Sequence, residues 1–177
     1  MKKTNTCSIV FHMKEKLVQV QLQGVTMPSI ETGPLALLQD VHSDKSIQIS
    51  IGAFEAGSII MHMEGLNSSR PRTHSLLAGI MKEQGLSIKS VEIYGMANSE
   101  DDNFFARLNY RKGLKNWSRD ICASDALALA IETNTPVYIH PALLDSAFPI
   151  FAADSDSHNA YIWHLGGSSQ LQHKELI

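Results

Sequence analysis

The sequence predicts a single α+β domain in which three or four helices pack against a mixed β-sheet. The chain has 177 residues, enough for one domain with a full hydrophobic core and short for two. Its composition, 44% hydrophobic and 19% charged, is that of an ordinary folded protein. The hydrophobic period changes along the chain in the order strands, two helices, strands, helix and strand, which is typical of the α+β class. We expect a flexible lead-in at 1–16, the domain at 17–145, and a partly irregular C-terminal extension at 146–177.

Three segments in the first third of the chain predict strands. "VQVQLQ" (18–23) and "SIQISI" (46–51) alternate apolar and polar residues strictly, the pattern of a strand with one buried face. "LALLQD" (35–40) follows the turn residues of "ETGP" and is expected to continue the sheet. Gly52 then ends the third strand.

Two helices are predicted next, because the apolar residues recur with the period of a helix face. Gly65 and Gly85 stand where a glycine commonly ends a helix, and Thr73 is a suitable N-cap for the second. The first stripe consists of Ala56, Ile59, Ile60 and Met63. The second consists of Leu76, Leu77, Ile80 and Met81.

The second half of the chain predicts a strand, a hairpin and a buried helix. "SVEIYG" (90–95) has strand character, and a solvated turn follows at 98–103. "FFARLNYRK" (104–112) alternates, and Gly113 is expected to turn it into a partner strand that runs through Trp117 to Ile121. The Ala/Leu run at 126–131 has little polar surface, so this helix should be buried.

The remaining segments are shorter. "PVYIH" (136–140) predicts one more strand and "PALLD" (141–145) a short helical turn. The periodicity fades from Ser146 onward, where "YIWH" (161–164) is expected to dock as an extra strand or to serve as an interface element.

Charge and cysteine content exclude several classes of function. A net charge of -3 gives no general attraction to nucleic acid or anionic membranes, so such binding must come from a local patch. Cys7 and Cys122 form neither a disulfide framework nor a zinc motif, and favour a reduced cytoplasmic setting. No apolar run approaches the roughly 20 residues that span a bilayer, and the apolar centre of the basic start is too short for a signal peptide. The chain has no phosphate-loop, dinucleotide, nucleophile-elbow or His-rich metal motif.

The first candidate site is "DICASDALALA" (120–130), where two aspartates precede a small, apolar run. Helix capping accounts for Ser124 and Asp125, because a serine accepts from first-turn amides and a carboxylate suits the positive end of the helix dipole. Asp120 instead ends a strand, where a neutral residue would be easier to place. Carboxylates converging from a strand end and a helix start can hold Mg²⁺ or share acid and base roles, so Asp120 and Asp125 are candidate metal ligands.

Further candidates lie on the two predicted helices. Glu55 is in a first turn, where dipole stabilisation is the plain interpretation. His62 follows two turns later on about the same side, and a lone histidine there is more often packed than a ligand. "RPRTH" places two arginines beside His74 at a helix start, which suits an anion or phosphate. These arginines are Arg70 and Arg72.

The predicted hairpin concentrates positive charge. Alternation places Arg107, Asn109 and Arg111 on one face, and Trp117, which lies beside the basic stretch, can stack on a base. An ordinary solvated strand face, balanced by the acidic turn at 100–102, is the competing interpretation. Five of the 15 basic residues of the chain fall within 13 positions: Arg107, Arg111, Lys112, Lys115 and Arg119.

Five stretches in this order resemble the bifunctional nuclease family, and together they cover about residues 17 to 145. The resemblance implies a compact α+β domain, usually self-associating and with a dimer favoured, and a magnesium-assisted nuclease activity on RNA and DNA. The stretches are "IGAFEAGSI" (51–59), "RPRTHSLL" (70–77), "FFARL" (104–108), "SDALALA" (124–130) and "PVYI" (136–139).

The resemblance also places family positions on this chain. Glu55 falls on the Glu-Ala pair of the family and His74 on its Thr-His pair. The Asp…Ser-Asp segment falls on Asp120, Ser124 and Asp125.

The chain departs from the family pattern at two places. Cys122 and Ala123 stand where the family typically has Arg-Pro, and Ser75 stands where it has an aspartate after Thr-His. The loss of an arginine and a carboxylate is expected if phosphate binding or metal affinity has weakened in this chain.

The leading hypothesis is a nuclease acting on RNA and DNA. Asp120 and Asp125, with Glu55, would hold Mg²⁺, and His74 would act as general acid or base, since the ordinary imidazole pKa is about 6.5. Arg70, Arg72 and the basic hairpin would hold the nucleic-acid backbone.

Two other hypotheses remain open. One is a non-enzymatic regulatory or scaffold homo-oligomer whose carboxylates only cap helices. The other is an enzyme acting on a small anionic metabolite bound at the "RPRTH" loop. Geometry separates them. Glu55, His74, Asp120 and Asp125 in one open cleft would favour an enzyme, whereas carboxylates dispersed over helix starts and bonded to their own backbone amides would favour the scaffold.

Overall fold

The predicted mixed sheet is present in the computed structural model, which describes residues 9–10, 16–66, 69–96, 104–145 and 161–164. Seven strands lie side by side in the order β4-β3-β2-β8-β5-β6-β7. Their bounds are β2 Val18–Met27, β3 Leu35–Asp40, β4 Ser46–Ser50, β5 Leu86–Met96, β6 Phe104–Lys112, β7 Lys115–Cys122 and β8 Val137–Ile139. Most of the predicted lead-in, the turn at 98–103 and most of the C-terminal extension lie outside the described residues.

The α+β fold class is confirmed. β5 and β8 pair in parallel, with Val91 opposite Val137, while the other pairs of the sheet are antiparallel. Two short strands extend this path: β1 (Ile9–Val10) pairs with β5, and β9 (Tyr161–His164) pairs with β2. "YIWH" is therefore an added strand.

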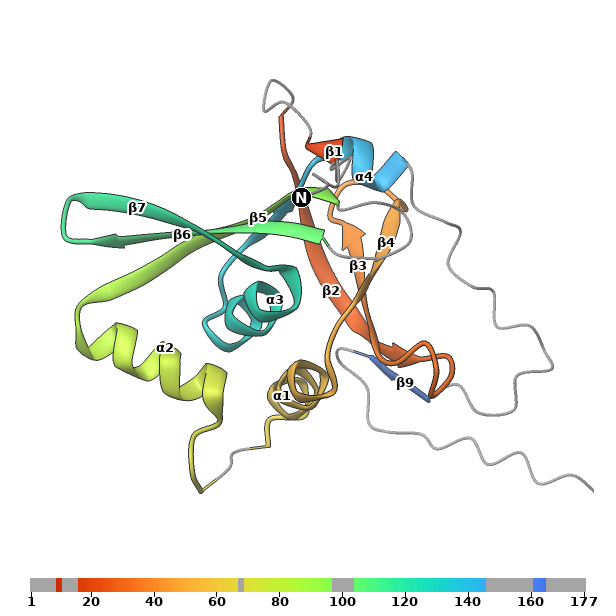
Figure 1. The fold of residues 1–177 in the computed structure, drawn as a ribbon, viewed down its shortest axis with the longest axis horizontal. Coiled ribbons are helices and arrows are strands. Elements are labelled where there is room, and N and C mark those ends of the chain that lie inside the picture. Colours follow the sequence, from red (N-terminus) through yellow and green to blue (C-terminus); the bar gives the residue numbers. More distant parts are fainter. Residues whose placement is uncertain (1–8, 11–15, 67–68, 97–103, 146–160, 165–177) are drawn as a thin grey trace, which may run out of the picture.

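Three helices cover one face of the sheet (Figure 1). They are α1 (Ala53–Met63), α2 (Thr73–Glu83) and α3 (Ala123–Glu132), while the short α4 (Pro141–Asp145) lies at the β4 side. α3 packs against β5 and β6 and is flanked by α1 and α2. Its buried alanines and leucines fill the centre of the core, as the Ala/Leu run predicted, and this burial stabilises the fold by about 1.5–3 kcal/mol for each leucine.

The first helix ends as its glycine predicts. Gly65 adopts a left-handed backbone with φ 64°, which an L side chain rarely adopts. The amide of Leu66 donates to the carbonyl of Met61 at 2.8 Å, and the Gly65 amide donates to the carbonyl of His62 at 3.1 Å. This pair of bonds closes the last turn and directs the chain toward α2.

The second helix packs by the face opposite to its predicted stripe. Leu76, Leu77 and Ile80 are 49%, 43% and 47% exposed, whereas His74 is buried and Ala78 is partly buried. The small side chain of Ala78 faces α3, so most of the predicted stripe is left half-exposed, with Met81 partly buried at its edge. Within the described part of the chain, no helix is long and apolar enough to cross a membrane.

Candidate metal centre

The first turns of α1, α2 and α3 bring three polar side chains together. One ligand atom each from Glu55, His74 and Asp125 can be chosen so that all lie within 4.8 Å of one another. Nε2 of His74 is 3.1 Å from Oδ1 of Asp125, which joins α2 to α3. Residues 51 positions apart in the chain therefore meet at one end of the helical layer.

Gly52 gives Glu55 its position. The carboxylate of Glu55 folds back over Gly52 and occupies the place where a Cβ of residue 52 would lie. Gly52 is the N-cap of α1 and has an extended backbone. Its missing side chain, rather than an unusual φ, is what lets the carboxylate turn inward.

His74 is 7% exposed, and its contact with Asp125 replaces the capping that the sequence predicted. The N-cap of α2 is Arg72 and that of α3 is Cys122, and neither helix has a side-chain cap hydrogen bond. The predicted caps at Thr73 and Ser124 are therefore wrong. Both residues lie one or two positions inside their helices, past the position from which a hydroxyl caps.

The three side chains fit a divalent cation. Ligand atoms about 2.1 Å from an ion lie at most about 4.2 Å apart, so a small inward rotation of the side chains would complete the set. Two carboxylates suit Mg²⁺ and Mn²⁺, and an imidazole nitrogen shifts the preference away from Mg²⁺ toward a first-row transition metal. Among the described residues, no other cluster of three such donors occurs.

Asp120 is placed elsewhere. It lies opposite Arg107 in the β6–β7 pairing, and its Oδ1 accepts from Nε of Arg107 at 3.0 Å. This hydrogen bond raises the pKa of Arg107. The Arg107 guanidinium lies 4.9 Å from the ring centre of Tyr94, whose pKa is raised by burial and by Asp120. Asp120 thus belongs to a polar cluster on the strands and does not join the three-helix group.

The basic residues of the hairpin divide between its two faces. Side chains alternate along β6, and Ala106 and Leu108 are buried on the side that carries α3. Arg107 and Arg111 point to the other side, where Asn109 also donates to Glu92 at 2.7 Å. The helix-side face carries Lys112, Lys115, Arg119 and Trp117, which pairs with Tyr110.

Trp117 has an intramolecular partner. Its ring stacks on that of Tyr110, with ring centres 6.0 Å apart and planes inclined by 18°, and Trp117 remains 41% exposed. The outer ring face is therefore the one that can meet a base.

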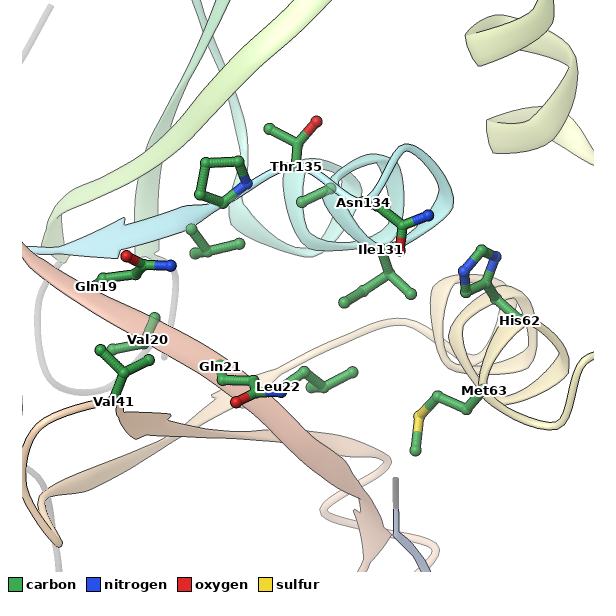
Figure 2. Close-up of a pocket in the computed structure, with 13 residues that line it drawn as sticks. Gln19, Val20, Gln21, Leu22, Val41, His62, Met63, Ile131, Asn134 and Thr135 are labelled. Carbon is green, nitrogen blue, oxygen red and sulfur yellow. The ribbon is translucent and has the colours of Figure 1, made fainter. Parts of the chain in front are cut away.

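Two hollows lie toward the C-terminal ends of α1 and α3, and His62 lines both. The larger, of about 630 Å³, lies between β2 and the helix ends (Figure 2). The lining of this hollow contains one titratable side chain, His62. The candidate catalytic residues named from the sequence are therefore not gathered in this hollow. The smaller, of about 390 Å³, lies between α1 and α2 and includes Arg72 and Ser75.

Arg72 lies against α1. Its Nη1 is 3.4 Å from where a Cβ of Gly57 would be, two residues beyond Glu55. Arg70 is exposed in the segment before α2.

Two features were missed from the sequence. The hydrophobic pattern predicts only a strand end at Gly52, although a glycine three residues before a glutamate has the spacing of a helix N-cap and its N3 residue. Glu132 was not singled out, although it lies seven residues after Asp125 and so on the same helix face. Nδ1 of His62 is 3.8 Å from Oε2 of Glu132.

Comparisons with known proteins cover this whole region. Residues 36–150 match the model of the bifunctional nuclease domain. An uncharacterized protein from two strains of Mycobacterium tuberculosis is 28% identical over 138 residues, which is 78% of this chain and 80% of that protein. Because the family model matches well over half of the chain, including α1, α2 and α3, this protein belongs to the bifunctional nuclease domain family.

Proposed function

We propose that this protein is a metal-dependent nuclease that hydrolyses phosphodiester bonds in RNA and DNA. One observation carries the proposal: Glu55, His74 and Asp125 converge from three helices, with ligand atoms within 4.8 Å, in a chain of this family. This group replaces the Asp120–Asp125 pair expected from the sequence.

In this proposal, one group of residues binds the metal ion and another residue binds the phosphate. Glu55, His74 and Asp125 hold a divalent cation, which, when bound, polarises a phosphate oxygen and makes water more acidic. Arg72 lies two residues before His74 and offers a positive charge to the same phosphate. Mg²⁺ is the expected physiological ion, and Mn²⁺ should bind more tightly because of the imidazole nitrogen.

The role of His74 differs from the general acid or base that the sequence predicted. Its Nε2 faces Asp125 from a buried position, which suits a ligand better than a group that exchanges protons with solvent. His74→Gln should therefore weaken Mn²⁺ binding about 10-fold or more. Unchanged Mn²⁺ affinity, together with loss of one limb of the pH–rate profile, would instead restore the acid–base role.

Nucleic acid is proposed to lie along the helix-side face of the β6–β7 hairpin. Three cations and the exposed Trp117 share this face, which combines backbone charge with a stacking ring. The cytoplasmic location and a homodimeric assembly, both expected from the sequence, are part of the same proposal.

A non-enzymatic scaffold is the second candidate, and the exposed apolar stripe of α2 favours it. Leu76, Leu77 and Ile80 offer an interaction surface that catalysis does not require. The departures at Cys122, which is exposed, and at Ser75 agree with this alternative.

Cleavage of single-stranded RNA and plasmid DNA by the full chain tests the two candidates. We expect cutting with Mg²⁺ or Mn²⁺, none with EDTA, and a loss of about 100-fold in Glu55→Gln and Asp125→Asn. Asp120→Asn serves as the matched carboxylate variant and should keep its activity, because Asp120 pairs with Arg107 instead. Equal cutting by the wild type and a folded Asp125→Asn variant would indicate a contaminant and favour the scaffold.

A further inference from the structure

The lining of the hollow of about 390 Å³ between α1 and α2 includes Ser58, three residues after Glu55, and Ser75, next to His74 in the chain. His62 follows Glu55 by seven residues on α1, and Glu132 follows Asp125 by seven residues on α3. Seven residues are about two helical turns, or about 10 Å along the helix. On each of the two helices, the earlier residue therefore belongs to the proposed metal centre and the later residue lines the hollow. The lining consists of Ser58, Met61, His62, Gly65, Leu66, Pro71, Arg72, Ser75 and Glu132.

The two ends of this hollow differ in charge. Arg72 marks the end next to the metal centre, because it precedes His74 by two residues and contacts α1 beside Gly57. The backbone carbonyl of Arg72 accepts from the Leu76 amide at 2.7 Å, but in the described part of the chain its guanidinium makes no hydrogen bond or ion pair. Glu132, whose carboxylate is 3.8 Å from His62 and about one-quarter exposed, marks the far end.

This polarity suits a nucleotide that ends in hydroxyl groups. A phosphate next to the metal centre can pair with the Arg72 guanidinium. A second phosphate at the far end would face the Glu132 carboxylate, and the two negative charges would repel each other at this short distance. Ribose hydroxyls, in contrast, can donate to that carboxylate. The volume is within the range of small-ligand sites, and Met61, Leu66 and Pro71 offer apolar surface to a base.

We propose that this hollow holds the 3′-terminal nucleoside of an RNA strand, so that the enzyme trims RNA from its 3′-hydroxyl end. The inference rests on the proposed nuclease function and names its substrate end. The oxygen of water bonds to the phosphorus of the terminal nucleotide, and the bond from that phosphorus to O3′ of the preceding nucleotide breaks. The proton of water passes to the departing O3′, which leaves a shortened strand with a 3′-hydroxyl and a free nucleoside 5′-monophosphate.

Binding of adenosine 5′-monophosphate (AMP) tests the hollow independently of cleavage. With the full chain and Mn²⁺, isothermal titration should show AMP binding at least 10-fold more tightly than adenosine 3′,5′-bisphosphate. Arg72→Gln should weaken AMP binding about 10-fold, and Lys82→Gln, at the other end of α2, should not. Glu132→Gln should remove the discrimination against the bisphosphate, while Glu83→Gln keeps it. Circular dichroism confirms that each variant is folded.

RNA with a 3′-hydroxyl or a 3′-phosphate end gives the second readout. We expect release of nucleoside 5′-monophosphates from the 3′-hydroxyl RNA only. After Glu132→Gln, the 3′-phosphate RNA should also be trimmed, and its terminal nucleotide should leave as a nucleoside 3′,5′-bisphosphate. AMP binding lost in Arg72→Gln without any cleavage would support the hollow and overturn the nuclease. Internal cutting without selective AMP binding would support the nuclease and overturn the end-binding role. Equal affinity for AMP and the bisphosphate in the wild type would also overturn it.

Discussion

Among single residues, Gly52 shapes the proposed metal centre without being one of its proposed ligands. The Glu55 carboxylate reaches inward only because no side chain stands at residue 52. The other two proposed ligands are held differently: His74 by burial, and Asp125 by its contact with His74. We therefore expect Glu55 to be the proposed ligand that is displaced most easily.

Gly52→Ala should separate folding from metal binding. The extended backbone at Gly52 accepts alanine, but the new Cβ meets the end of a flexible glutamate, which must move away. We expect Mn²⁺ affinity to fall about 10-fold, as for loss of support to a ligand, with a cost in stability of about 1 kcal/mol at the N-cap. Isothermal titration and thermal unfolding measure the two effects.

The control is Gly79→Ala on α2, where nothing lies within 4 Å of the added Cβ. That variant should keep the wild-type Mn²⁺ affinity. If Gly52→Ala also keeps it, the inward position of Glu55 is not required for the ion.

At the same scale, the sequence separated candidate residues from the rest but could not group them. Glu55, His74 and Asp125 were all recognised as candidates, and so was Asp120. Asp120 and Asp125 are five residues apart, yet a strand end and a helix start project side chains in directions set by tertiary packing. In the structure, Asp120 pairs with Arg107, and Asp125 contacts His74. Only the docking of α2 and α3 decides this, and docking leaves no local pattern.

At the scale of elements, the β6–β7 hairpin allows a comparison between two faces of one ribbon. The helix-side face presents Lys112, Lys115 and Arg119, and the opposite face presents Arg111 and the paired Arg107. Sequence alternation correctly placed Arg107, Asn109 and Arg111 on one face. Alternation could not show that the Arg107 guanidinium pairs with Asp120 and lies over the ring of Tyr94.

Neutralising the helix-side face should weaken nucleic-acid binding selectively. In an Asp125→Asn background, which prevents cutting, Lys112→Gln/Lys115→Gln/Arg119→Gln should bind single-stranded RNA at least 10-fold more weakly. The slope of log affinity against log salt should fall by about 2, since each phosphate contact on a single strand contributes about 0.7. Fluorescence anisotropy at several salt concentrations measures both quantities.

Arg111→Gln, on the opposite face, is the matched variant and should bind within about threefold of the parent, with a salt slope reduced by no more than 0.7. Equal losses per charge from both faces would show that the hairpin attracts nucleic acid only through its overall charge. The assignment to one face would then fail.

α2 shows where periodicity stops being informative. The spacing of Leu76, Leu77 and Ile80 predicted a helix and a stripe, and the helix is present. An apolar stripe normally faces the core, but α2 docks through His74 and Ala78 and leaves the stripe half-exposed. Periodicity fixes which side chains share a face and leaves the partner of that face open.

At the scale of the whole molecule, the order of strands in the chain differs from their order in the sheet. β8 lies between β2 and β5, which places residues 137–139 beside residues 18–20 and 91–93. Alternation identified each strand, but pairing between segments so far apart depends on the whole sheet.

The exposed stripe of α2 leads to a prediction about the assembly. Two copies of one helix packed antiparallel bury the same stripe twice, which is the self-complementary contact of a two-fold dimer. The stripe would form the apolar centre of that interface, with the polar ends of α2 in its rim. We therefore expect the protein to sediment at twice the 19.5 kDa mass of one chain.

Leu77→Glu/Ile80→Glu should convert this dimer to a monomer, because four carboxylates would then be buried in one interface. Leu114→Glu, at a hairpin turn where the leucine is fully exposed, is the control and should remain dimeric. Analytical ultracentrifugation between 1 and 100 µM distinguishes the two states. The proposed metal centre lies on the inward face of α2, where His74 is buried, so the monomeric variant should keep its Mn²⁺ affinity. A wild-type protein that stays monomeric at 100 µM would leave the stripe to a different partner and remove the dimer from the proposal.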